Sequence, residues 1–175
     1  MTTPVSASIQ QSIAANKFYP PHINPSQSLD RHSIISDRIG ATGFSGRIII
    51  IEAQAGQGKT TLVYQFLEQT GTPYIWYQIG SEDSDPVVLL GALNLAFIRK
   101  FKYFKSPQLE AILDNGQIGP MDLQGCANIL LNDIDAALES DVFLVLDDLH
   151  LIGESQLTNQ LLDYLIDTSP PNLHY

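Results

Sequence analysis

The sequence is poor in positive charge and has almost no cysteine. Lys and Arg number 9 among 175 residues, against 19 Asp and Glu, so the formal net charge is −10. This excess of negative charge excludes a general attraction of the segment to nucleic acid or to an anionic membrane surface. The one cysteine, Cys126, can form no internal disulfide, so no oxidising compartment is indicated. We expect its thiol to pack on a buried helix face.

Long apolar runs are absent as well. The longest candidate, 142–146, is far shorter than the roughly 18 residues that a membrane span requires. Residues 1–11 are polar and lack the apolar core of a secretory signal. With 44% hydrophobic and 16% charged residues, the composition is that of one globular domain, for which we predict a cytoplasmic location.

The chain divides into a lead-in and an α/β domain. Pro20, Pro21 and Pro25 predict that residues 1–28 are a flexible or extended lead-in. Over 29–175, helical patterns alternate with strands that are apolar throughout, which predicts a three-layer α/β/α domain with a mostly parallel sheet. The expected helices are 29–39, 60–69, 85–104, 107–113, 121–139 and 156–167, and the expected strands are 47–53, 74–79, 142–146 and the start of another at 172–175. Because that last strand only begins, we interpret the domain as incomplete.

A phosphate-binding loop follows the first expected strand. The segment 53–60 reads AQAGQGKT, with Ala53 where glycine is commoner in such loops. Gly56 and Gly58 allow the backbone to curl so that successive N–H groups converge on a phosphate. The next helix would add the positive end of its dipole. A strand before the loop and a helix after it are the context that this motif requires.

The residues around the loop predict a site for a magnesium–nucleotide complex. The cofactor-binding set comprises 55–58 (Ala55, Gly56, Gln57, Gly58) with Lys59, Thr60 and Thr61. Lys59 is expected to contact the β- and γ-phosphates and to act in catalysis, while the Thr60 hydroxyl is expected to bind Mg²⁺. Thr61 would bind the α-phosphate. The sequence has no NKxD-type guanine-reading motif, which favours ATP over GTP.

A second motif places carboxylates at the end of a strand. Residues 142–148 read VFLVLDD, an apolar strand that ends in two aspartates. Ligands of open α/β sheets bind beyond the carboxyl ends of the strands, so Asp147 is expected to hold Mg²⁺. Asp148 is expected to orient or deprotonate the attacking water as the catalytic base. His150 could sense the γ-phosphate, but a solvated loop histidine is the favoured interpretation.

Three further features are interpreted as structural. The basic and aromatic residues of 99–105 resemble a nucleic-acid stacking strip, yet cations at a helix end complement its dipole. Glu82, Asp83 and Asp85 either cap the following helix or lie near the nucleotide, and capping is favoured. Trp76 is expected in the core.

Several blocks of the chain, from about residue 16 onward, resemble one family in order and spacing. They are KFYPP at 17–21, AQAGQGKTTLVYQF from Ala53, the stretch 76–86, LVLDDLHLI from Leu144, and LLDYLIDTSPPNLHY to the end. The sequence is similar to the STAND class of signalling P-loop NTPases, and within it to the MalT-like branch of large ATP-binding LuxR-type transcriptional regulators. The segment corresponds to the N-terminal part of the NTPase domain, truncated after the acidic strand and its helix.

The resemblance implies a regulatory switch driven by ATP. Members of this family bind ATP with an inducer, self-associate through C-terminal regions, and return to the resting state by hydrolysis. It implies for Lys59, Thr60, Asp147 and Asp148 the roles already given. It also implies that the next strand would lie between the phosphate-loop strand and the acidic strand.

Two other functions remain open. One is a small P-loop kinase, which would need cations to stabilise the transition state; residues 106–175 contain no Lys or Arg, which argues against it. The other is a nucleotide-binding scaffold without turnover, which only a measurement of hydrolysis would distinguish from a slow ATPase.

Overall fold

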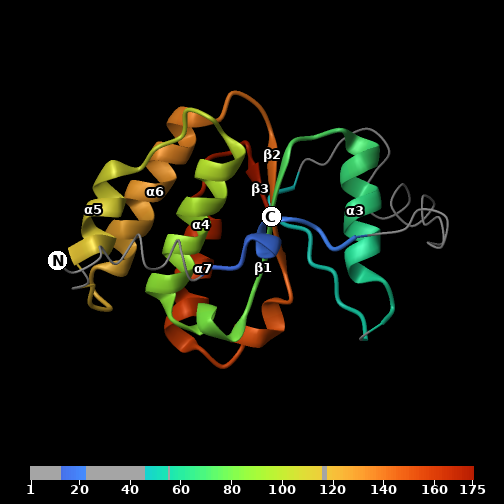
Figure 1. Ribbon diagram of the computed structural model, residues 1–175, viewed down its shortest axis with the longest axis horizontal. Coiled ribbons are helices and arrows are strands. Elements are labelled where there is room, and N and C mark those ends of the chain that lie inside the picture. The colour runs from blue at the N-terminus through green and yellow to red at the C-terminus, as the bar shows by residue number, and fades with distance from the viewer. Residues whose placement is uncertain (1–12, 23–45, 55, 116–117) are drawn as a thin grey trace.

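The computed structural model of the protein describes residues 13–22, 46–54, 56–115 and 118–175. In these ranges the chain forms a three-stranded parallel sheet in the order β1-β2-β3 and five α-helices (Figure 1). The α/β class and the parallel sheet are therefore confirmed. The strands are β1 (Tyr74–Gln78), β2 (Val142–Asp147) and β3 (Leu173–His174); the helices are α3 (Lys59–Thr70), α4 (Pro86–Lys100), α5 (Pro107–Asn115), α6 (Leu123–Ala137) and α7 (Gln156–Thr168); short 3-10 helices are η1 (Ala15–Phe18), η2 (Ser81–Ser84) and η3 (Leu149–Ile152).

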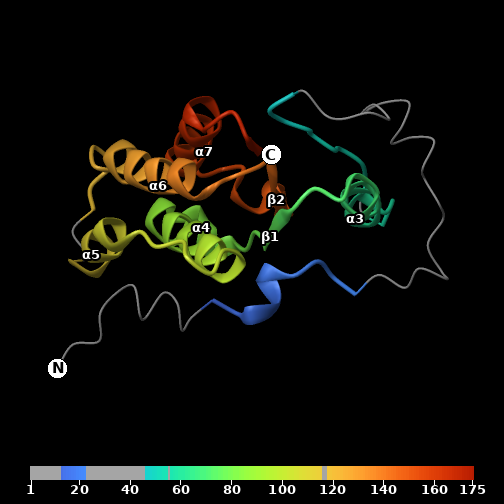
Figure 2. The same ribbon diagram turned by 90° about the horizontal axis from the view of Figure 1, so that it is seen from above.

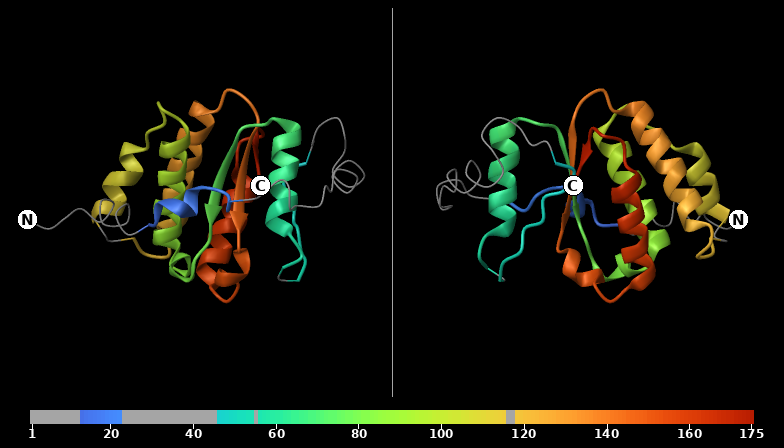
Figure 3. Two further views of the ribbon diagram at one scale, coloured as in Figure 1. Left: turned by 45° about the vertical axis from the view of Figure 1, so that its right-hand side comes forward. Right: turned by 180° about the vertical axis from the view of Figure 1, so that it is seen from behind.

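Helices lie on both sides of the sheet. Figures 2 and 3 show α3 on one side of β1 and β2, and α4, α6 and α7 on the other. The strands are apolar on both faces, and successive side chains point to opposite faces of the sheet. Each face therefore packs against its own helices. Ile75 and Tyr77 join the cluster that contains α4, whereas Trp76 between them packs with Phe66 and Leu67 of α3. Trp76 is thus a core residue, as expected.

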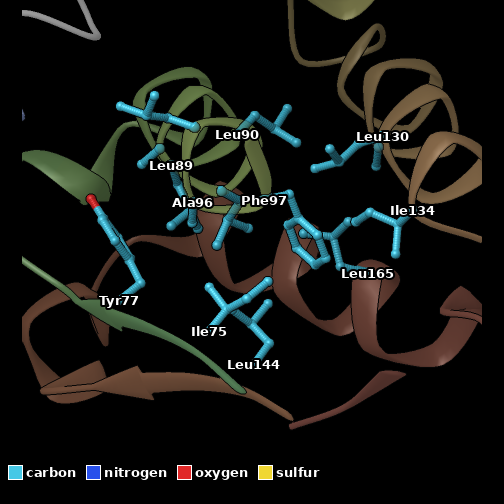
Figure 4. Packing of buried hydrophobic residues seen from close by; sticks show 14 of the residues in the cluster. Ile75, Tyr77, Leu89, Leu90, Ala96, Phe97, Leu130, Ile134, Leu144 and Leu165 are labelled. Carbon is cyan, nitrogen blue, oxygen red and sulfur yellow. The ribbon is translucent and has the colours of Figure 1, made fainter. Parts of the chain in front are cut away.

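The larger core lies between the sheet and the helices α4, α6 and α7. Figure 4 shows Phe97 of α4 near Leu165 of α7, with Ile75 and Leu144 of the sheet facing them. The Cys126 thiol of α6 belongs to this cluster, is buried, and forms no disulfide, as expected. No helix in the described ranges has the length and apolar composition needed to cross a membrane.

The isoleucine-rich segment 47–53 differs from its prediction as a buried strand. Ile48 is 41% exposed and Ile50 is 77% exposed. Among the described residues, its backbone pairs with Tyr175 alone: the Ile49 N–H donates to the Tyr175 carbonyl (2.7 Å) and the Tyr175 N–H donates to the Arg47 carbonyl (2.8 Å). An apolar run becomes a strand only where a neighbouring backbone completes its hydrogen bonds. The short β3 and Tyr175 provide too few backbone partners for this segment. The segment still lies beside β3, so β3 separates it from β2, as the resemblance implies.

Polar contacts fix the start of this segment against the end of α7. The Arg47 guanidinium donates to the carbonyls of Ile166 (2.9 Å) and Ser169 (2.7 Å), which complements the negative end of the helix dipole. His174 Nδ1 lies 2.9 Å from the Gly46 carbonyl oxygen. The chain leading into the phosphate loop is therefore anchored at the sheet before the loop begins.

Other elements begin or end at residues that differ from the predicted ones. Within the predicted lead-in, residues 15–18 form η1 and pack against β1 rather than extending away. The helix predicted over 85–104 ends at Lys100, after which Phe104 folds back into the core while Arg99 lies over the Phe18 ring at 4.6 Å. These contacts agree with the structural interpretation of the basic–aromatic stretch. The helix predicted over 29–39 lies outside the described residues.

The cap of α4 provides a first test of this description. Asp85 is the N-cap, and its carboxylate accepts a hydrogen bond from the Val87 N–H at 2.9 Å, with Pro86 at the first helical position. Asp85→Ala is expected to lower the free energy of unfolding by about 1 kcal/mol, measured by urea denaturation. Glu154→Ala, which removes an exposed acid without removing a cap, is the control. Equal losses in the two variants would contradict the capping role.

Candidate nucleotide-binding site

The phosphate loop turns sharply and opens directly into α3. Gly56 has φ 79° and Gly58 has φ 76°, left-handed values that favour glycine. A Cβ added at Gly56 would meet no atom within 4 Å, so glycine is needed there for its backbone angle and not for space. The Gln57 N–H donates to the Gln54 carbonyl at 3.3 Å and closes the turn. Ala55 lies outside the described residues.

The N-terminus of α3 is not capped by a side chain. Gly58 is the N-cap, and glycine has no side chain that could accept from the first N–H groups of the helix. Its carbonyl accepts the first helical bond, from the Leu62 N–H at 3.0 Å. The free N–H groups and the positive end of the helix dipole favour an anion at this position. Thr61, half-buried in the first turn, is the third residue of this helix.

Lys59 lies over its own loop. Its Nζ donates to the carbonyls of Ala53 (3.0 Å) and Gln54 (3.5 Å), and both bonds are exposed to solvent. Exposed hydrogen bonds of this kind are exchanged readily for others. The Lys59 charge is also near enough to the acidic strand to act on the pKa of Asp147. Contacts of Lys59 with phosphate remain a prediction.

The two sequence motifs meet through one contact. The Thr60 hydroxyl at the start of α3 donates to the Asp147 carboxylate, 3.2 Å from Oδ2 and 3.5 Å from Oδ1. Phe143 and Val145 of β2 face α3, and the period of two places Asp147 on the same face. Residues 87 positions apart in the chain are thereby joined at the carboxyl end of β2.

The surroundings of Asp147 favour a cation. Burial raises the pKa of its carboxyl, and the negative charge of Asp148 raises it further. The Thr60 hydroxyl, the Asp148 N–H and the Lys59 charge lower this pKa and only partly offset the increase. A metal ion would relieve both unfavourable effects. The described ranges contain no group of three or more His, Cys, Asp or Glu that could hold a metal, whereas one hydroxyl and one carboxylate fit Mg²⁺, which keeps water or phosphate oxygens as further ligands.

Asp148 adopts an unusual backbone conformation. At φ 61° and ψ 33° it is the one non-glycine residue with positive φ in the described ranges, and it stands at the start of η3. Its N–H donates to Asp147 Oδ1 at 3.1 Å, and its Oδ2 accepts from Gln78 Nε2 at 3.2 Å. Left-handed aspartate costs little, but such residues concentrate at functional sites. The side chain of His150, two residues further, is exposed.

Gln78 is the site residue that sequence reasoning missed. It ends β1 and pairs in register with Asp147 of β2. The available signal was a polar residue at the carboxyl end of an otherwise apolar strand. No motif marks such a glutamine, and only the pairing of β1 with β2 brings it to the two aspartates.

The acids that follow β1 belong mainly to a separate charged cluster. Asp83 is buried and accepts hydrogen bonds from Lys17 Nζ (2.9 Å), the Tyr77 hydroxyl (2.7 Å) and the Gly80 N–H (2.7 Å). Glu82 accepts from the same Lys17 Nζ at 2.6 Å. Of the three acids for which capping was favoured, Asp85 caps α4, and Asp83 caps the short η2 by accepting from the Gly80 N–H. Neither Glu82 nor Asp83 caps α4, because Lys17, from a distant segment, pairs with both. Burial and the neighbouring Asp83 raise the pKa of Tyr77.

The fold and this site are consistent with an α/β nucleotide-binding domain. No family model matches the chain, and no solved structure matches it significantly. The chain is 31% identical over 148 residues to proteins named serine/threonine-protein kinase PknK, from two strains of Mycobacterium tuberculosis and from Mycobacterium bovis. The match covers 82% of this chain and 13% of each relative, so the chain spans a small part of the length of the curated relatives that it matches.

Proposed function

We propose that the chain is the nucleotide-binding part of a signal-responsive regulator, and that it binds ATP with Mg²⁺ and hydrolyses it slowly. The observation that carries this proposal is the 3.2 Å contact between the Thr60 hydroxyl and Asp147 Oδ2. It joins the two oxygen ligands that a magnesium–triphosphate site requires, beside an uncapped helix N-terminus. Neither motif alone would bring these ligands together.

Each residue of the site has a defined task in this proposal. Backbone N–H groups of 55–60 bind the phosphates, and Lys59 exchanges its bonds to loop carbonyls for phosphate oxygens. Thr60 and Asp147 hold Mg²⁺, which when bound neutralises charge on the β- and γ-phosphates. Asp148 orients the attacking water and accepts its proton.

The finer classification is also a proposal. Helices on both sides of a parallel sheet support a three-layer P-loop NTPase fold, and the sequence blocks support the MalT-like branch of the STAND class. The similarity to proteins named as protein kinases agrees with a nucleoside triphosphate as ligand and with a role in signalling. A phosphotransferase made of this chain alone is less well supported, because residues 106–175 provide no Lys or Arg. An inducer and self-association through other regions are further expectations of the proposal, and transcription is the process we expect it to regulate.

The proposal is tested by calorimetric titration of the protein with ATP, ADP and GTP, in Mg²⁺ and in EDTA. We expect binding of ATP that depends on Mg²⁺, together with slow release of phosphate. If ATP binds neither in Mg²⁺ nor in EDTA, the proposal is overturned, and binding without phosphate release would favour a scaffold.

The variant Asp147→Asn tests the binding of the metal separately from the binding of the nucleotide. In Mg²⁺ we expect its affinity for ATP to fall by about tenfold or more, to the value measured in EDTA. The ligand-free variant should be more stable than the wild type near neutral pH, because the raised pKa shows that the folded state disfavours the charged carboxylate. The sign follows from linkage: the folded state retains the proton above the ordinary pKa of Asp, so this group makes wild-type stability fall as the pH rises.

The control for this variant is Asp163→Asn, which changes the same charge on an exposed position of α7. It should leave both affinity and stability near the wild-type values. Unchanged dependence on Mg²⁺ in Asp147→Asn would contradict the assignment of this carboxylate to the metal.

A further inference from the structure

The side chain of Gln78 is directed to the candidate site by the pleat of β1. Tyr74 and Trp76 pack on the side of α3, so the period of two places Gln78 on that same side. In the register of the parallel pair, Gln78 lies opposite Asp147. A half-buried amide thus stands among the acids at the carboxyl ends of two adjacent strands.

The backbone on both sides of Gln78 is held in place. The Ile79 N–H donates to the Asp147 carbonyl at 2.9 Å, so pairing with β2 continues past Gln78. Before it, the Tyr77 hydroxyl donates to the buried Asp83 at 2.7 Å on the opposite face. The position of the amide is therefore set by the sheet, and only its side-chain torsions remain adjustable.

This amide holds one oxygen of Asp148. Gln78 Nε2 donates to Asp148 Oδ2 at 3.2 Å. In the described ranges the hydrogen bond to this carboxylate ends on Oδ2, so Oδ1 is able to accept from a water molecule. A neutral donor suits this place, since a cation would compete with Mg²⁺ for the acids and a carboxylate would repel them.

We propose that Gln78 is a positioning residue for ATP hydrolysis: by holding Oδ2 of Asp148, it orients the other carboxylate oxygen towards the attacking water. It contributes to turnover and not to nucleotide affinity. This inference rests on the proposed function, because it requires Asp148 to act as the base. No other described side chain donates a hydrogen bond to that carboxylate.

The test compares two replacements of Gln78. Gln78→Met keeps the length and removes the donor, and Gln78→Glu keeps the shape and replaces the donor with a repelling carboxylate. For both we expect kcat for ATP hydrolysis to fall about tenfold or more, while in Gln78→Met, which adds no charge, the Kd for Mg-ATP changes less than about twofold. Gln124→Met, at an exposed position on α6, is the control and should retain the wild-type kcat. Circular dichroism and a thermal melt establish that each variant is folded.

A double-variant cycle distinguishes positioning from a general structural effect. If Gln78 acts through Asp148, Gln78→Met should lower kcat no further when Asp148→Asn is already present. Additive losses, or wild-type turnover in a folded Gln78→Met or Gln78→Glu variant, would overturn the inference. Wild-type protein that binds Mg-ATP without turnover would overturn it and leave nucleotide binding intact, whereas wild-type protein that binds no ATP would overturn the proposed function itself.

Discussion

Lys59→Ala should bind Mg-ATP about a hundredfold more weakly than the wild type, if not weaker still. The variant removes the cation that lies over the loop, and hydrogen bonds from an ammonium group to phosphate are among the strongest that proteins form. Its effect on the ligand-free protein should be small, because among the described residues the wild-type Nζ bonds to two loop carbonyls through bonds that are exposed to solvent. Calorimetric titration with a parallel melting curve measures both quantities.

The matched control is Lys102→Ala. It causes the same loss of charge in a chain whose net charge is already −10. Its Nζ lies 5.4 Å from the exposed Tyr103 ring, beyond the end of α4 and outside the phosphate loop. A similar loss of affinity in both variants would mean that Lys59 acts only through overall charge. An unchanged affinity in Lys59→Ala would contradict the phosphate-loop assignment.

Much of the fold could be predicted because the local patterns agree with the tertiary structure. Residues 142–146 are apolar throughout and form a strand that lies between helices, and Gly71 closes α3 in the left-handed conformation, with φ 64°. The segment 47–53 has an equally strong strand pattern and is not a strand. The apolar pattern can be seen in the segment alone, but strand formation also requires hydrogen bonds to a neighbouring backbone. In the described ranges, Tyr175 is the residue that provides them.

The candidate site also contains residues that the sequence predicts and residues that it does not. Thr60 and Asp147 could be brought together from the sequence, because each belongs to a motif whose place in a parallel sheet is known. Gln78 could not, since a glutamine at a strand end has no characteristic spacing. Lys17 and Asp83 are 66 positions apart, and neither residue by itself indicates a buried ion pair.

Lys17→Met is expected to destabilise the protein by about 3–5 kcal/mol, the usual cost of leaving one member of a buried ion pair alone. The Lys17 side chain is 10% exposed and that of Asp83 is 0% exposed. After the change, Asp83 keeps its bonds from Tyr77 and Gly80, but its charge loses the only cation that contacts it in the described ranges. Urea denaturation monitored by circular dichroism measures the loss.

Two comparisons make this prediction specific. Lys17→Met combined with Asp83→Asn removes the orphaned charge and should recover part of the stability, whereas Lys102→Met at the surface should cost little. The difference between wild type and Lys17→Met should narrow in acid, because the hydrogen bond from Lys17 lowers the pKa of Glu82. That part of the stability is present above the ordinary pKa of Glu and is lost as the pH falls through the lowered one.

The position of the charged cluster of Lys17, Glu82 and Asp83 also predicts how the loss of Lys17 should affect function. Tyr77, which donates to Asp83, is the neighbour of Gln78 in β1, so the cluster and the candidate site hold the same strand end from opposite faces. If Lys17→Met remains folded, its affinity for Mg-ATP should stay near the wild-type value, because none of the described residues assigned to phosphate or Mg²⁺ contacts the cluster. A selective loss of turnover would show that the N-terminal segment supports the placement of Gln78; a selective loss of affinity would contradict the separation of the two sites.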